Sequence, residues 1–307
     1  MPFKKEIKDN ILIVITGATA VGKTSVSIEL AKKLHCDIIS ADSRQIYKEM
    51  NTGTAKPALE EMQGVPHHFI DHVSIFDNYD AGIYEKEVID FLEHYYNNTS
   101  NTAILCGGTG MYIEAVTRGL DEFPDIPAEI KNKYTDIFNT KGLEHLQEEL
   151  KNKDKEYYNK VDIYNPHRLI RALSVIDFTG KKFSHFLKGK SKKRNFITVF
   201  IRLDLPRDIL YQRINTRVDD MVNAGLIDEA RTLYPHRKLK ALQTVGYKEL
   251  FDFFDGKISE TEAIELIKRN TRRYAKRQIT WFGNRGSWNV FSPFQIQEIM
   301  RFVEKNI

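Results

Sequence analysis

The chain has 307 residues, of which 41% are hydrophobic and 29% charged, with a formal net charge of +4 and two cysteines. This is the composition of a globular protein of one or two domains, and it excludes a low-complexity chain and a disulfide framework. No apolar run approaches the ~20 residues of a membrane span, and the start, MPFKKEIKDN, lacks the apolar core of a signal peptide. We therefore expect a cytoplasmic protein with no membrane partner.

The first 120 residues alternate strand-like and helix-like segments. The run ILIVITGA, from residue 11, is continuously apolar and ends near a glycine, which predicts a parallel strand buried on both faces. The segments that follow are a helix, a short strand, a weaker strand, an amphipathic helix and a strand that ends at glycines: KTSVSIELAKKL, CDIISAD, HHFIDHV, AGIYEKEVIDFLEHYY and NTAILCGGTG. This alternation predicts an α/β fold with a doubly wound parallel sheet.

The pattern changes after Gly119. From 121 to 190 no buried-strand run appears and the period is helical, which predicts a mainly helical insertion domain with a small core of Phe178, Phe183 and Phe186. The α/β pattern then resumes with the strand NFITVFIRL, a helix opened by Pro206 and a short last strand, SWNVFS. We thus expect residues 1–120 to form the first part of the core, 121–190 the insertion, and 191–307 the return to the core with C-terminal helices.

Two segments are basic and contain no acidic residue, Lys181 to Arg194 and Ile267 to Gln278. Charge runs are mostly solvated surfaces. Two of them in a near-neutral chain also fit a polyanionic partner. Charge alone leaves both interpretations open.

The segment GATAVGKT fits the pattern G-x-x-x-x-G-K-[ST] and stands between a predicted strand and a predicted helix. Its glycines let backbone N–H groups converge on phosphate oxygens, and the helix N-terminus adds partial positive charge. Lys23 supplies a point charge, and the Thr24 hydroxyl is suited to ligate Mg²⁺. The sequence therefore predicts a P-loop NTPase-like core, with a phosphate loop made of Gly17, Ala18, Thr19, Ala20, Val21, Gly22, Lys23 and Thr24.

The loop alone does not identify the phosphates. An ATP-hydrolysing P-loop protein usually has a second apolar strand that ends in an acid for the Mg²⁺ shell. The best candidate strand here, AILCGG at 103–108, ends in glycines. This weakens the ATPase and GTPase interpretations.

Asp42 comes just past the second predicted strand, which we expect to neighbour the strand before the phosphate loop. Ligands bind at that edge of open α/β sheets, so Asp42, Ser43 and Gln45 are expected to face whatever the loop holds. A carboxylate there can accept a proton, bind Mg²⁺ or accept the amino hydrogens of a base. The alternative is that it only caps the next helix.

Motifs along nearly the whole chain resemble those of the tRNA dimethylallyltransferase (tRNA isopentenyltransferase) family, in its compact bacterial form. In order they are GATAVGKT, ADSRQIYKEMNTGTAKP, GVPHHFIDH, CGGTGMYIEAVTRGL, NPHRLIRALSV, RVDDMVNAGLIDEA, ALQTVGYKEL and RRYAKRQITWF. The resemblance implies transfer of a dimethylallyl group from dimethylallyl diphosphate to N6 of the adenosine 3′ of the anticodon, with release of diphosphate. It implies the tRNA anticodon stem-loop as a partner, and we expect a monomer.

The same resemblance implies roles for individual residues. Asp42 would be the general base, while Lys23 and Mg²⁺ held with Thr24 would stabilise charge on the leaving diphosphate. Arg217 would be a further diphosphate ligand; its alternative is a solvated neighbour of acidic residues. Contacts with tRNA are implied for Asp42, Ser43, Arg44, Gln45, Thr109, His167, Arg168, Leu169, Ile170 and Arg171. The basic helix Lys268 to Arg277 would contact either diphosphate or RNA.

Three other functions remain as alternatives. A P-loop kinase would use Asp42 to activate a hydroxyl, a free-nucleotide isopentenyltransferase would prenylate AMP, ADP or ATP, and an RNA-binding ATPase switch would need γ-phosphate sensing. NPHRLIR and the basic exit of the insertion favour tRNA. The insertion is expected to face the tRNA, with its basic run against the phosphate backbone. His67, His68 and His72 lack the spacing of a metal site, and we expect them to be structural.

Overall fold

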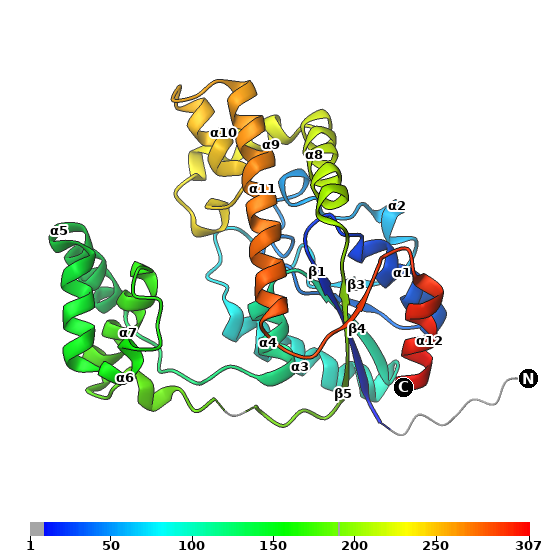
Figure 1. Ribbon diagram of the computed structural model, residues 1–307, viewed down its shortest axis with the longest axis horizontal. Helices are drawn as coiled ribbons and strands as arrows, with labels where there is room; N and C mark the ends of the chain where they lie inside the picture. The colour runs from blue at the N-terminus through cyan, green and yellow to red at the C-terminus, as the bar shows by residue number, and fades with distance from the viewer. Residues whose placement is uncertain (1–8, 190) are drawn as a thin grey trace, which may run out of the picture. The chain divides into compact units, whose positions relative to one another are not determined.

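The computed structural model describes residues 9–189 and 191–307 (Figure 1). Within them, six strands form one parallel sheet in the order β3-β2-β4-β1-β5-β6. The strands are β1 (Ile11–Gly17), β2 (Ile38–Ser40), β3 (His67–His68), β4 (Thr102–Gly107), β5 (Ile197–Leu203) and β6 (Asn289–Phe291). This confirms the predicted parallel α/β fold.

The helices alternate with the strands in the first part of the chain and dominate the rest. The α-helices are α1 (Lys23–Leu34), α2 (Leu59–Met62), α3 (Ala81–Asn98), α4 (Gly110–Arg118), α5 (Ala128–Lys153), α6 (Lys155–Tyr158), α7 (Pro166–Thr179), α8 (Arg207–Asn223), α9 (Leu226–Leu233), α10 (Tyr247–Phe254), α11 (Glu260–Gly283) and α12 (Ile296–Asn306). The 3₁₀ helices are η1 (Thr52–Thr54), η2 (Phe183–Phe186), η3 (Tyr234–His236) and η4 (Lys240–Leu242).

One expectation about the sheet was wrong. We expected β2 to neighbour β1, but β4 lies between them. β4 pairs with β1 over six residues, whereas β2 pairs over only three. The longer strand has four buried residues in succession, Thr102 to Leu105, and this suits a central position covered on both faces.

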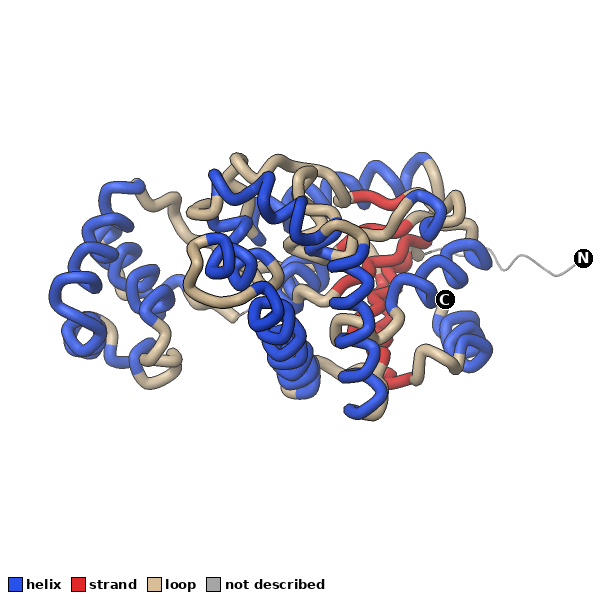
Figure 2. The backbone as a smooth tube through the Cα atoms, turned by 90° about the horizontal axis from the view of Figure 1, so that it is seen from above, coloured by secondary structure: helices blue, strands red, loops and turns tan. Residues whose placement is uncertain are grey.

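The sheet separates two hydrophobic cores, because alternate residues of a strand point to opposite faces. Leu12 and Val14 of β1 belong to one core, with side chains from α3, α4, α9, α10 and α11. Ile13 and Ile15 belong to the other, with side chains from α1, α8 and α12. Figure 2 shows the strands of the sheet between these groups of helices.

The chain divides into two compact units, one with residues up to Arg118 and from Lys193 on, the other from Gly119 to Lys192. The second unit is slightly wider than the insertion expected at 121–190. Lys190, which is part of the predicted basic run, lies outside the described residues. This unit is helical: α5, α6, α7 and η2 enclose a core of its own. Phe183 is buried there and Phe186 packs against it, but Phe178 is 45% exposed, so its predicted place in the core was wrong.

Phe178 faces solvent because of its position on α7. The buried side of that helix carries Leu169, Ala172, Leu173 and Val175, and Phe178 falls outside this stripe. Cys36 and Cys106, both in the larger unit, are free cysteines. Among residues 9–189 and 191–307, no helix combines the length and apolar character that a membrane crossing requires.

Candidate active site

The phosphate loop joins β1 to α1 with the geometry that its sequence pattern predicts. Gly17 has φ 149° and lies so close to β5 that a Cβ there would be 2.5 Å from the carbonyl oxygen of Leu203. Glycine is therefore required at this turn. Lys23, the first residue of α1, bends back over the loop and donates to the carbonyls of Gly17 at 3.1 Å and Ala18 at 2.9 Å. Burial lowers the pKa of Lys23 to about 8.

Asp42 lies in the turn that follows β2. Its Oδ1 accepts the backbone N–H of Arg44 at 2.9 Å and of Gln45 at 3.4 Å, so part of the carboxylate does cap a local turn. Oδ2 accepts no hydrogen bond from the residues that the structure describes. The capping and the catalytic interpretations of Asp42 are thus compatible, because each uses a different oxygen.

Thr109 joins the turn of Asp42 to the end of β4. Its Oγ1 accepts the backbone N–H of Ser43 at 3.0 Å, and its own N–H donates to the carbonyl of Ala41 at 3.1 Å. Gln45 donates from Nε2 to the carbonyls of Thr54 and Ala55 at 3.2 and 3.1 Å. Arg44 donates to the carbonyl of Ala241 at 3.0 Å. These bonds fix the segment after β2 beside the end of its neighbouring strand.

Arg217 lies on α8 and reaches the phosphate loop from the side. Its Nη2 donates to the carbonyl of Ala55 at 3.1 Å and its Nη1 to Thr19 Oγ1 at 3.5 Å. Burial lowers the pKa of the guanidinium, and the charge of Asp42 opposes this effect. Arg217 is therefore not the solvated neighbour of acidic residues that its spacing left open.

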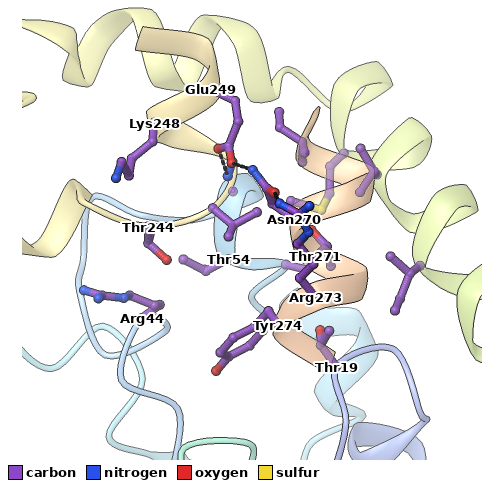
Figure 3. A pocket seen from close by; sticks show the side chains of 18 of the residues that line it. Thr19, Arg44, Thr54, Thr244, Lys248, Glu249, Asn270, Thr271, Arg273 and Tyr274 are labelled. Atoms are coloured by element: carbon purple, nitrogen blue, oxygen red, sulfur yellow. Dashed lines mark hydrogen bonds between the residues drawn. The ribbon is translucent and has the colours of Figure 1, made fainter. Parts of the chain in front are cut away.

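These groups share one cavity of about 770 Å³ in the larger unit. Figure 3 shows its wall: Thr19, Thr54, Arg44, Thr244, Lys248 and Glu249 lie around a face of α11 that presents Asn270, Arg273 and Tyr274. Asp42, Ser43, Arg217 and Arg277 also line it. Phosphate-loop, carboxylate and cationic groups from distant parts of the chain therefore open onto one space.

Five of the six basic residues of α11 divide into two sets. Lys268 pairs with Asp219 at 2.8 Å and Glu265 at 3.1 Å, and Arg272 donates to Asn215 on α8. Arg269, Arg273 and Arg277 recur every four residues along the cavity wall. No carboxylate of the described chain pairs with these three.

Sequence reasoning missed two residues that organise the site. Gln278 of α11 accepts the backbone N–H of Thr19 at 2.9 Å and donates to the carbonyl of Gly108 at 2.9 Å. Glu229 of α9 accepts the backbone N–H groups of Asn51, Thr52 and Gly53 at 2.8–3.0 Å. Both residues occur in motifs that carried the family resemblance, but nothing local to them indicates these distant partners.

The remaining predicted residues lie on α7 of the smaller unit, which begins at Pro166 with the Asn165 side chain as its cap. His167, Arg168 and Arg171 are exposed there and Ile170 is half-buried. Leu169 is fully buried in the core of this unit. The family resemblance implied that Leu169 contacts tRNA, but its side chain packs inward with Ala172 and Leu173 and is not accessible to RNA.

No group of three or more His, Cys, Asp or Glu side chains that could hold a metal ion occurs in residues 9–189 and 191–307. The three histidines noted in the sequence are bonded separately: His67 to the Val65 carbonyl, His68 to Asp37 and His72 to Glu87. The Thr24 hydroxyl, at the start of α1, belongs to an exposed residue.

Comparison with known proteins gives one consistent result. The sequence model of the family described as IPP transferase matches residues 45–285. The tRNA dimethylallyltransferase of Christiangramia forsetii is 51% identical over 273 residues, which are 89% of this chain and 90% of that protein.

Two solved structures are similar over almost the whole chain. A full-length tRNA isopentenylpyrophosphate transferase from Bacillus halodurans has a TM-score of 0.72 at 36% identity, covering 97% of this chain and 96% of that one. A eukaryotic dimethylallyltransferase, described as acting on tRNA, has a TM-score of 0.80 at 27% identity and covers 97% and 77%. Both neighbours are prenyl-group transferases with the P-loop NTPase-like fold. The chain therefore belongs to the IPP transferase family, the family of the tRNA dimethylallyltransferases.

Proposed function

We propose that this chain transfers the dimethylallyl group of dimethylallyl diphosphate to N6 of the adenosine 3′ of the anticodon in tRNA. The observation that carries the proposal is that Asp42, Arg217 and the phosphate-loop residues Thr19 and Ala20 line one cavity. A bond forms between N6 and the allylic carbon, the bond from that carbon to oxygen breaks, and diphosphate leaves. The N6 proton goes to Asp42.

The leaving group is stabilised by fixed positive charge. The N–H groups at the start of α1 have no acceptor within the helix, and the helix dipole adds to their pull on an anion. Lys23 and Arg217 bring two cations to the same loop. Negative charge develops on the diphosphate as the C–O bond breaks. Hydrogen-bond donors and cations that are already in position stabilise this charge without having to reorganise.

Mg²⁺ is the metal that this donor set fits. The described chain offers no carboxylate cluster, and Mg²⁺ commonly keeps several waters and binds through substrate phosphates. Thr24 would hold it, together with oxygens of the diphosphate. When bound, the ion neutralises charge on the phosphate oxygens.

Asp42 suits the part of general base because one of its oxygens remains available. The amino group of adenine is a weak nucleophile, since its lone pair is delocalised into the ring. Removal of its proton as the new bond forms is worth about 10²–10⁴ in rate. Oδ1 is held by the turn, and Oδ2 accepts no hydrogen bond from the described residues.

The smaller unit is proposed to bind the anticodon stem-loop through the exposed His167, Arg168 and Arg171 of α7. The target base must leave its stack to reach a cavity, and bases in single-stranded loops do so at least cost. We propose that the enzyme acts as a monomer in the cytoplasm.

Label transfer from radiolabelled dimethylallyl diphosphate with Mg²⁺ tests this function, with unmodified tRNA, AMP and ATP as parallel acceptors. Label in tRNA alone is the expected result. Label in AMP or ATP would move the substrate to free nucleotides. ATP turnover without any transfer would replace the proposal with a kinase.

A further inference from the structure

The carboxyl end of β4 lies beside the phosphate loop, because β4 is the direct neighbour of β1. P-loop proteins that hydrolyse nucleoside triphosphates usually carry an acid at the end of such a strand. Here β4 ends at Gly107, and the carbonyl of Gly108 instead receives a hydrogen bond from Gln278 Nε2 at 2.9 Å. A neutral amide from α11 thus stands at the end of this strand.

Gln278 is held on both sides by backbone groups. Its Oε1 accepts the N–H of Thr19 at 2.9 Å, so the side chain bridges the phosphate loop and the end of β4. The residue is 6% exposed. A Cβ on Gly108 would be 2.2 Å from Nε2, so only glycine leaves room for the amide. Both polar ends of Gln278 are satisfied, and moving it would leave buried groups unpaired.

The two ends of the phosphate loop differ in how many of their donors are already bonded. On the strand side, the N–H of Thr19 is bonded to Gln278, and the Thr19 hydroxyl accepts from Arg217 at 3.5 Å. On the helix side, the N–H groups of Gly22, Lys23 and Thr24 belong to the unsatisfied start of α1. Thr19 and Ala20 line the cavity, but the backbone N–H of Thr19 is already bonded to Gln278, so that donor is taken before any phosphate binds.

We propose that Gln278 is a specificity-determining residue, which limits the phosphate loop to two phosphates and rejects nucleoside triphosphates. A third phosphate would need the Thr19 N–H and the space beside Gly108, and both are taken. The inference rests on the proposed function, because it assumes that the loop holds the diphosphate end of the prenyl donor. The Gln278 bridge would explain how a P-loop selects a diphosphate in the presence of ATP.

Binding of inorganic diphosphate and of Mg-ATP to the wild-type chain and to Gln278→Met tests the proposal by calorimetry. Methionine is similar in length and neither donates nor accepts as an amide does. Freeing one N–H to bond a charged phosphate is worth about 10- to 100-fold in affinity. We expect ATP to bind tighter by this factor while diphosphate affinity changes less than about threefold. The ratio of the two affinities is the readout, because a merely structural role would weaken both ligands together.

Two variants serve as controls. Gln147→Met removes the same kind of bond in the smaller unit, where Nε2 donates to the carbonyl of Ile163 at 2.9 Å, and should leave the ratio unchanged. Gln278→Glu keeps an oxygen for the Thr19 N–H and adds a negative charge. It should weaken both ligands without favouring ATP.

Should Gln278→Met fail to fold, Gly108→Ala is the second route, since the added Cβ would push the amide away from the loop. It should also favour ATP. An unchanged ratio in folded Gln278→Met or Gly108→Ala, or wild-type binding of ATP as tight as that of diphosphate, overturns the inference. These assays need no tRNA. Prenyl transfer with an unchanged ratio would overturn the inference alone, and a changed ratio without transfer would overturn only the proposed function.

Discussion

Arg217 of α8 donates a hydrogen bond to the carbonyl of Ala55 at 3.1 Å, so the segment after η1 fixes the guanidinium beside the phosphate loop. That segment is itself held by Glu229, whose carboxylate accepts three successive backbone N–H groups and the Tyr247 hydroxyl at 2.7 Å. A residue outside the cavity therefore controls the position of a cation inside it. Glu229 acts through the loop rather than on the substrate.

Glu229→Gln should lower kcat/KM for dimethylallyl diphosphate by about tenfold or more. One oxygen becomes an NH₂ group that cannot accept, and a backbone N–H of η1 loses its partner at a cost of about 1–3 kcal/mol. Steady-state kinetics and urea unfolding would measure both effects. Asp80→Ala is the matched control, because it removes the acceptor of two backbone N–H groups at the start of α3, away from the cavity. It should lower stability but leave kcat/KM unchanged; equal kinetic losses in both variants would remove the positioning role.

Much of the fold is predictable because its signals are local. The phosphate loop, its flanking strand and helix, and the change to a helical insertion all follow from short patterns of residues. The order of the strands is a different matter. β4 lies between β1 and β2, a position that suits its length and burial. Strand order depends on how all the strands pair with one another, so the sequence of a single strand does not predict it.

The candidate site was predicted in part for the same reason. Asp42 and Thr109 each follow the carboxyl end of a strand, so their meeting at one edge of the sheet could be anticipated. Gln278 could not, because its two partners are 259 and 170 residues away along the chain. Leu169 shows the opposite error: its spacing with Ala172 and Leu173 indicates a buried helix face, and the family resemblance overrode that local signal.

Asp42→Asn should reduce prenyl transfer by about 10²–10⁴ while dimethylallyl diphosphate still binds. Asparagine keeps an oxygen to accept the N–H groups of Arg44 and Gln45, so the turn should persist, but it cannot take up the N6 proton. Single-turnover transfer and calorimetric binding of the donor would separate the two effects. Activity within tenfold of wild type would exclude Asp42 as the general base.

The affinity for diphosphate should fall as the pH rises above about 8, the pKa that burial gives Lys23. Below this pH the amine is charged and attracts the anion. Above it, binding must first return a proton, and this costs up to about tenfold in affinity per pH unit. Asp42, Cys106 and Arg217 also influence this amine. Calorimetry between pH 7 and 9.5 would give the profile.

Lys23→Arg is the control for this titration, because a guanidinium stays charged across the range. Protonation of diphosphate itself is common to both proteins and cancels in the comparison. The variant should therefore lose less affinity than wild type at high pH. Parallel profiles would mean that Lys23 does not titrate there.

Leu169→Ala should destabilise the smaller unit by about 2–5 kcal/mol, because it removes a fully buried side chain from that core and leaves a cavity. Arg168→Ala, one residue earlier on the exposed face of α7, should change stability by less than about 0.5 kcal/mol. The same pair separates packing from recognition. At a temperature where both variants are folded, Arg168→Ala should raise the KM for tRNA and Leu169→Ala should leave it near wild type. A rise in KM confined to Leu169→Ala would restore the side-chain contact with RNA that its burial argues against.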